Sequence, residues 1–175
     1  MKQAFRLGTF ALSVAISMPL LAVADEAGQR VDYLSFAQGA LPVALEGDAA
    51  ALKVGMEQAL LAIDGNDGGY GLTPKPGAAE MSISFVYQLP ASTTFTEFAI
   101  PNVLETPSPS QTFVRSVEIA GSGSGAEGDF GVLATAALET HAAKGLVTSI
   151  PASVEKPVRW VRVTLAGGID IQRDK

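Results

Sequence analysis

The chain has 175 residues, of which 18 are acidic and 12 are basic, so its formal net charge is −6. This acidic balance argues against non-specific binding to nucleic acid and against docking on anionic lipid. The absence of cysteine excludes a disulfide framework, thiolate metal ligands and a cysteine nucleophile, and a single histidine argues against a zinc site.

Residues 1–24 have the layout of a secretory signal peptide. Lys2 and Arg6 give a positive start, an apolar stretch follows over Phe10–Val23, and small residues lead to a cleavage point. The apolar run is short for a membrane span, so the alternative is a retained N-terminal anchor. We therefore expect an exported protein, periplasmic or at the cell surface. Its mature part, residues 25–175, keeps 10 basic and 18 acidic side chains and suits a single domain.

The first part of the mature chain is predicted to contain short strands and one helix. The segment "VDYLSFAQGALPVAL" indicates one or two strands broken at Gly39 and Pro42. Helical spacing of apolar residues within Gly47–Asp64 predicts a helix of roughly 10–12 residues, with Asp48 as its cap.

From Glu80 onward the apolar residues alternate with a period of two, which predicts strands. The clearest strand, Met81–Leu89, is expected to end at Pro90. Further strands are expected within Thr93–Pro101, Thr112–Ala120, Phe130–Glu139, Gly145–Pro151 and Pro157–Gly168. With a flexible turn over Gly121–Asp129, this pattern predicts an all-β fold, an antiparallel jelly-roll β-sandwich with one short helix near the N-terminus.

Several motifs occur in an order that resembles a known family. They are the Asp64–Gly65 turn that leads to Tyr70, the stretch Ile119–Gly125 followed by Phe130, and Trp160–Val161–Arg162. This order is similar to that of the galactose-binding-like β-sandwich of discoidin and coagulation-factor C-type domains, which includes many bacterial carbohydrate-binding modules. The resemblance extends from about Val31 to Gly168, and it depends on the order and spacing of the motifs.

The chain departs from that family pattern in two places. Family members often place Thr and Trp after the Asp-Gly turn, where this chain has Gly68–Gly69 and Tyr70. The acidic residue that closes the family's calcium site comes from the last strand, where this sequence ends in "GGIDIQRDK". Either Asp170 takes that role, or the sequence is the front part of a longer protein.

The Asp64 segment is the candidate metal site. Asp64, Asn66 and Asp67 supply side-chain oxygens within four residues, which suits Ca²⁺, and the resemblance implies the same ion. An EF-hand is rejected, because Lys75 stands where the closing glutamate is required. The alternative is that Asn-Asp-Gly-Gly is ordinary turn chemistry.

A carbohydrate site needs an aromatic face and a few polar side chains on loops. The loop residues that could provide them are Tyr70, Lys75, Asn102, Glu105 and His141. Trp160 and Phe130 lie within strand patterns and are expected in the core. For Arg115 and Arg162 the alternative to sugar binding is a structural role, in which each forms a salt bridge with acidic neighbours.

No catalytic arrangement emerges from the sequence. "GSGSG" lacks the lysine and the helix of a phosphate loop, no G-x-S-x-G is present, and nothing places a partner beside His141. The prediction is a non-catalytic module that binds carbohydrate or another glycan, either with calcium as a stabilising ion or without a cofactor. The alternative is an interaction or scaffold module of the cell envelope, associated with or fused to another envelope domain and without a small-molecule ligand.

Overall fold

The computed structural model describes residues 30–66, 80–101, 103–104, 112–141, 146–153, 156–167 and 169–170. The chain divides into two compact units at Asp32, and the fold below is that of the second unit, residues 32–175. The predicted signal peptide lies outside the described residues.

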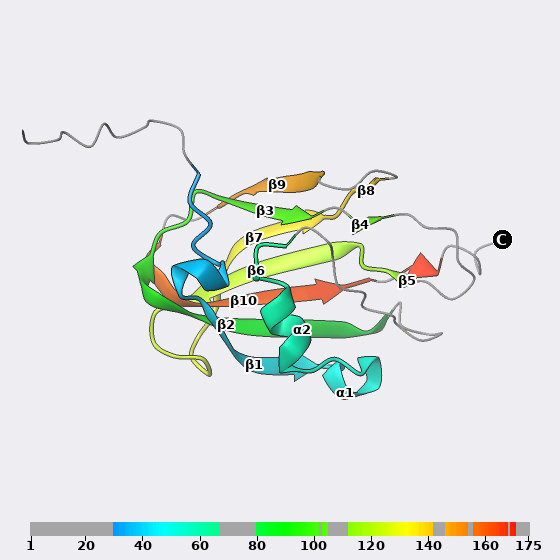
Figure 1. The fold of residues 1–175 in the computed structure, drawn as a ribbon, viewed down its shortest axis with the longest axis horizontal. Coiled ribbons are helices and arrows are strands. Elements are labelled where there is room, and N and C mark those ends of the chain that lie inside the picture. The colour runs from blue at the N-terminus through cyan, green and yellow to red at the C-terminus, as the bar shows by residue number, and fades with distance from the viewer. Residues whose placement is uncertain are drawn as a thin grey trace, which may run out of the picture. The chain divides into compact units, whose positions relative to one another are not determined.

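An antiparallel five-stranded sheet forms the larger part of the described fold. Its strands lie side by side in the order β1-β2-β10-β6-β7 (Figure 1). They are β1 (Leu41–Gly47), β2 (Ser82–Thr93), β10 (Val158–Ala166), β6 (Ser116–Ser122) and β7 (Gly131–Ala137). The order places strands that are far apart in sequence next to one another at the centre of the sheet.

Shorter strand pairs complete the β structure. They are β3 (Glu97–Pro101) with β9 (Val147–Pro151), β4 (Val103–Leu104) with β8 (Thr140–His141), and β5 (Thr112–Phe113) with β11 (Ile169–Asp170). The β4–β8 pair is parallel, whereas the other pairs are antiparallel. The predicted all-β sandwich is therefore confirmed, with one parallel pair that the sequence pattern did not predict.

The core lies between the five-stranded sheet and the β3–β9 pair. Phe85 and Tyr87 of β2 are almost fully buried, as the alternating pattern predicted. They belong to the same apolar cluster as Phe98 of β3 and Ile150 of β9. Burial of each such large side chain stabilises the fold by about 1.5–3 kcal/mol.

The single helix predicted within Gly47–Asp64 is instead two short ones. These are α1 (Ala49–Leu52) and α2 (Met56–Leu61), and Lys53 adopts a left-handed conformation between them (φ 55°). Asp48 does not cap α1 with its side chain. Its Oδ2 accepts a hydrogen bond from the backbone N–H of Ser82 at 3.0 Å, so it ties the helical segment to β2.

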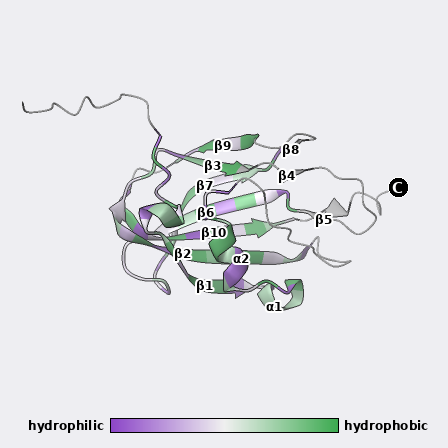
Figure 2. Cartoon of the chain, in the orientation of Figure 1, coloured by the Kyte–Doolittle hydropathy of each residue, from purple (hydrophilic) through white to green (hydrophobic). Residues whose placement is uncertain are grey.

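Helix α2 packs against the core-facing side of the sheet. The Tyr87 hydroxyl donates a hydrogen bond to the Ala59 carbonyl at 3.0 Å, and Ala59 is fully buried. In Figure 2, the hydrophilic and hydrophobic parts of α2 follow one another along the helix, as its sequence MEQALL does, and Ala59 is its buried residue. This contact fixes the end of α2, and therefore the turn that follows it.

The prediction that Pro90 ends its strand is wrong, because β2 continues to Thr93. The register between β10 and β2 is irregular between Val158 and Trp160, so Pro90 lies where the ladder is interrupted. Proline lacks a backbone N–H and is tolerated at such irregularities. Pro42 lies within β1 for the same reason, since β1 is an edge strand and its register shifts beside Pro42.

The prediction that Trp160 and Phe130 belong to the core is also wrong, because both are only half-buried. Trp160 pairs with Gln88 and Ser122 on the outer face of the sheet. Its neighbour Val161 takes the core-facing position and is fully buried. Adjacent residues of a strand point to opposite faces, so only one of the two can enter the core.

Gly121 provides a test of the packing. A Cβ atom at this position would lie 2.5 Å from Val158 and 2.8 Å from Leu133, both buried side chains. We expect Gly121→Ala to destabilise the domain by about 1–3 kcal/mol through overpacking. The control is Gly131→Ala on the paired strand, where a Cβ atom meets nothing within 4 Å. Thermal unfolding of both variants measures the difference, and equal melting temperatures would contradict this core arrangement.

Candidate functional site

Most of the predicted site residues lie outside the described part of the chain. These are Asp67, Tyr70, Lys75, Asn102 and Glu105. The backbone of His141 is described in β8, where it pairs with Leu104 of β4. Asp64 and Asn66 are described in full, so the structure tests the predicted metal segment only at these two positions.

Asp64 and Asn66 form an exposed turn. It follows α2, which ends at Leu61, after the two residues 62–63. The backbone N–H of Asn66 donates a hydrogen bond to Asp64 Oδ1 at 2.7 Å. Gly65 between them has a φ of +79°, which suits glycine. This is the side-chain-to-backbone turn typical of aspartate. Calcium binding here stays a prediction.

A second turn, Asp32–Phe36, carries exposed aromatic rings and is called the aromatic turn below. Asp32 holds it together. Its Oδ1 accepts a hydrogen bond from the N–H of Leu34 at 3.1 Å, and its carbonyl accepts one from the Ser35 hydroxyl at 2.8 Å. Ser35 is buried, and a 3₁₀ helix, η1 (Phe36–Gln38), follows directly. The backbone of the turn is therefore well anchored.

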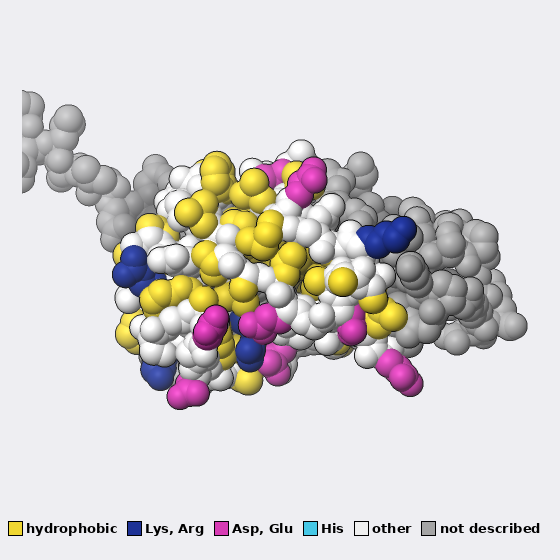
Figure 3. Space-filling view, turned by 90° about the horizontal axis from the view of Figure 1, so that it is seen from below, with side chains coloured by type: hydrophobic (Ala, Val, Ile, Leu, Met, Phe, Trp, Pro, Cys, Tyr) yellow, Lys and Arg dark blue, Asp and Glu magenta, His cyan; other side chains and the backbone are white. Residues whose placement is uncertain are grey.

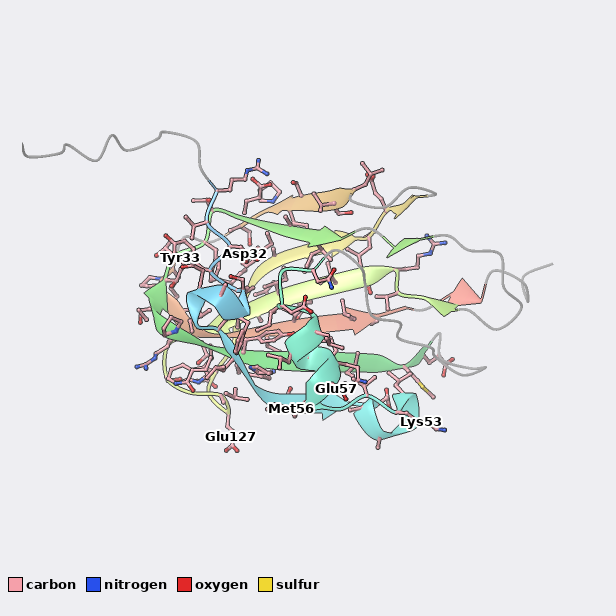
Figure 4. All side chains as sticks on the ribbon, viewed as in Figure 1. Asp32, Tyr33, Lys53, Met56, Glu57 and Glu127 are labelled. Atoms are coloured by element: carbon pink, nitrogen blue, oxygen red, sulfur yellow. The ribbon has the colours of Figure 1, made fainter. Side chains whose placement is uncertain are left out.

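The rings of Tyr33 and Phe36 are 46% and 52% exposed. Figure 4 labels Tyr33 and Asp32 side by side at this turn. The Tyr33 ring meets the buried ring of Phe95 edge to face, at a centroid distance of 6.5 Å and an interplanar angle of 82°. Phe95 in turn packs against Phe98 at 4.9 Å. Such aromatic contacts orient a ring while they leave part of its surface free.

The aromatic turn lies beside the Asp64 turn. The backbone N–H of Phe36 donates a hydrogen bond of 2.7 Å to the carbonyl of Ile63, the residue before Asp64. Asp32 and Asp64 are both exposed, so two carboxylates accompany the aromatic rings at this corner of the domain. We take the two turns together as the candidate functional site.

This arrangement suits a ligand that has an apolar face and several hydroxyl groups. An exposed aromatic ring stacks on the C–H face of a sugar, and carboxylate oxygens accept hydrogen bonds from its hydroxyls. Because the turn is already anchored, little conformational freedom is lost when a ligand binds. In the part of the chain that the structure describes, no group of three or more His, Cys, Asp or Glu residues is arranged to hold a metal ion.

The sequence reasoning missed Tyr33 and Phe36 because it assigned them to a short strand. A local signal was available: Asp32 and Ser35 are both residues whose side chains form turns with nearby backbone groups. No local sequence pattern indicates that Tyr33 and Phe36 lie near Asp64. That neighbourhood depends on the hydrogen bond from Phe36 to Ile63, and these two residues are distant in sequence.

A separate apolar surface lies on the edge strand and the second helix. Its large side chains are all exposed: Leu41 and Val43 of β1, and Met56, Leu60 and Leu61 of α2. Figure 3 shows hydrophobic side chains gathered on this side of the molecule, with acidic side chains among and around them. Leu41 pairs with Gln88 and therefore lies on the outer side of the sheet, whereas α2 lies on the core-facing side. We call these exposed side chains together the β1–α2 surface.

The two arginines singled out in the sequence differ in the structure. Arg162 forms an ion pair with Glu46 at 3.6 Å, and its guanidinium lies 4.6 Å from the centre of the Phe130 ring. The pair is partly exposed and contributes little to stability. Among the described residues, the Nε of Arg115 is buried without a hydrogen-bond partner, and an ion pair is found for Arg162.

Within the described residues, no helix is both long enough and apolar enough to cross a membrane.

No protein-family model matches the chain, and no curated protein matches it. Solved structures do resemble it. One is a GH29 fucosidase from Ruminococcus gnavus in complex with fucose, with 13% identity, a TM-score of 0.39, and coverage of 61% of this chain and 18% of that one. The chain therefore spans less than a fifth of the fucosidase.

Two carbohydrate-binding modules are also similar. The family 32 module of NanJ from C. perfringens, in complex with galactose, is 19% identical with a TM-score of 0.42, and 63% of this chain and 74% of that one are covered. A CBM32 module from Clostridium perfringens, in complex with GalNAc-β-1,3-galactose, is 12% identical with a TM-score of 0.46, and the shares are 74% and 84%. Both of these neighbours are carbohydrate-binding modules, the class of protein that the order of the sequence motifs resembles.

Proposed function

We propose that this chain is a non-catalytic module that binds glycan through the aromatic turn. The observation that carries the proposal is the pair of exposed rings, Tyr33 and Phe36, on an anchored turn beside the Asp64 turn. Large aromatic residues are normally at least partly buried. Two exposed aromatic rings within four residues therefore indicate a surface that contacts a ligand. The carboxylates of Asp32 and Asp64 supply the acceptors that a sugar requires.

The proposed setting is an exported protein of the cell envelope or cell surface. The signal-like character of residues 1–24 supports export. The acidic net charge keeps the module away from anionic polymers, so a neutral or cationic glycan suits it better than a polyanion. The partner is therefore a glycan or another envelope component.

Replacement of both rings tests the aromatic turn. We expect Tyr33→Ala combined with Phe36→Ala to weaken glycan binding by roughly tenfold or more, because both stacking faces are lost. A glycan array identifies the ligand, and titration calorimetry measures its affinity for the two forms. The matched control is Leu146→Ala combined with Val147→Ala, which removes two exposed side chains elsewhere. No glycan binding by the unmodified protein, with or without Ca²⁺, would contradict the function.

Calcium is proposed as a stabilising ion at the Asp64 turn. Asp64, Asn66 and Asp67 provide oxygen ligands, and Gly65 lets the backbone turn toward an ion. An ion that binds only the folded state raises its stability by mass action. We expect millimolar Ca²⁺ to raise the melting temperature above that in EDTA. Asp64→Asn should remove the shift, whereas Glu57→Gln, an equal charge change on α2, should retain it. A melting temperature that is the same in EDTA and in Ca²⁺ excludes the ion.

The second candidate function is an interaction module of the envelope, and the β1–α2 surface favours it. Strand pairing at the β1 edge is hindered by Pro42 and by the irregular register beside it, so a partner would contact the side chains instead. A photo-crosslinker introduced at Leu41 should then capture one defined envelope protein in intact cells. The same crosslinker at Leu146, also exposed, is the control. Identical products at both positions count against this function.

A further inference from the structure

The outer face of the five-stranded sheet carries a groove at the end of the sheet where β6 begins. Its volume is about 550 Å³, and it is shallow and widely open on one side. The outward-facing lining residues are Ser116, Glu118, Thr135, Ala137, Thr164 and Ala166. They are called the Glu118 groove below. It lies on the opposite side of the sheet from α2 and the core.

The strand register explains why this part of the face is hollowed. Thr164, Glu118 and Thr135 form one row across β10, β6 and β7. The next row consists only of small residues, with Ser116 between Ala166 and Ala137. Directly paired residues have Cβ atoms about 4.5–5.5 Å apart, so three small side chains in a row leave a continuous shallow trough.

The opposite end of the same face is filled by larger side chains. Arg162 lies one row away from Glu118 and reaches across β2 to Glu46, while its guanidinium covers Phe130. This part of the face is closed, since Val86 and Ala120 between these groups are fully buried. The groove therefore has a wall at the Arg162 end.

Glu118 is the chemically distinctive group in this groove. It lies on β6, in the interior of the sheet, and its side chain is half-buried. It has no hydrogen bond or ion pair with the described part of the chain, because Arg162 on the adjacent row is paired with Glu46. A carboxylate that is partly removed from water is stabilised by a cation or by hydrogen-bond donors.

The groups around Glu118 determine which kind of ligand fits the groove. The hydroxyl of Thr135, directly opposite Glu118, has no hydrogen bond with the described part of the chain. The methyl groups of Ala137 and Ala166 offer a flat apolar surface. A ligand that fits has an ammonium group for the carboxylate, hydroxyls for the threonine, and a C–H face for the alanines.

We infer that the Glu118 groove is a second binding site, separate from the aromatic turn, for a glycan chain with free amino groups, as in a polymer of glucosamine. The inference rests on the proposed function only in its ligand class, since the groove and the aromatic turn share no residue. An extended chain would lie across β10, β6 and β7, with one protonated amine at Glu118.

The test measures binding of a glucosamine oligomer to the full chain by titration calorimetry. An N-acetylated oligomer of equal length serves as the uncharged comparison. The unmodified protein should bind the amino form more tightly. Glu118→Gln should weaken that binding by roughly tenfold or more, because it removes a charge-assisted hydrogen bond. The matched control is Glu127→Gln, an equal charge change on the loop after the far end of β6 (Figure 4).

A second variant tests the position of the ligand without a change in charge. Ala137 is exposed on β7, so Ala137→Phe should leave the fold intact while it fills the groove and reduces binding. Thermal unfolding verifies that both variants are folded. The inference is overturned by an absence of binding to the unmodified protein, by equal affinity for the acetylated oligomer, or by unchanged affinity in Glu118→Gln.

The aromatic-turn variant separates this inference from the proposed function. Tyr33→Ala combined with Phe36→Ala should bind the glucosamine oligomer as tightly as the unmodified protein. If that variant loses the oligomer while Glu118→Gln keeps it, the ligand belongs to the aromatic turn and the groove is refuted. If array binding fails but the oligomer still depends on Glu118, the aromatic turn is refuted and the groove stands.

Discussion

The antiparallel pairing of β2 with β10 is the constraint on which the rest of the domain depends. It aligns Tyr87 with Val161, and both side chains are buried on the core side. From Tyr87 the structure continues to the surface in three bonded steps. Its hydroxyl binds the carbonyl of Ala59 in α2, α2 leads to Ile63, and the Ile63 carbonyl binds Phe36 of the aromatic turn. The candidate site is thus positioned by the centre of the sheet.

The same pairing determines what the outer face presents. When Val161 points inward, Arg162 points outward, where it pairs with Glu46 and covers Phe130. Glu118 is left without that cation, beside a row of small residues. The two faces of one sheet therefore carry two different surfaces. The core side supports an aromatic, loop-based site at the margin of the domain, and the outer side supports a groove that depends on strand register alone.

The sequence allowed the strands to be predicted better than the site. Period-two alternation correctly identified the buried positions of β2 and β6, because Phe85 and Ile119 follow a local pattern. Long-range contacts caused the errors. The helix is interrupted at Lys53, and Asp48 binds Ser82 instead of capping it, a partner distant in sequence. The turn-forming residues correctly predicted a turn at Asp64. They could not predict that Phe36 lies next to this turn, because that contact is long-range.

By itself, the sequence determined the class of fold, the alternation of each strand and the acidic character of the surface, since these follow from local pattern and composition. Only the tertiary structure decided which face of each strand is covered. Trp160 and Val161 are adjacent and both apolar, and alternation states only that they point in opposite directions. The choice between them was made by the packing of α2 and the β3–β9 pair against one side. The same packing decided that Tyr33 and Phe36 lie beside Asp64, and that Glu118 lies in a groove without a partner among the described residues.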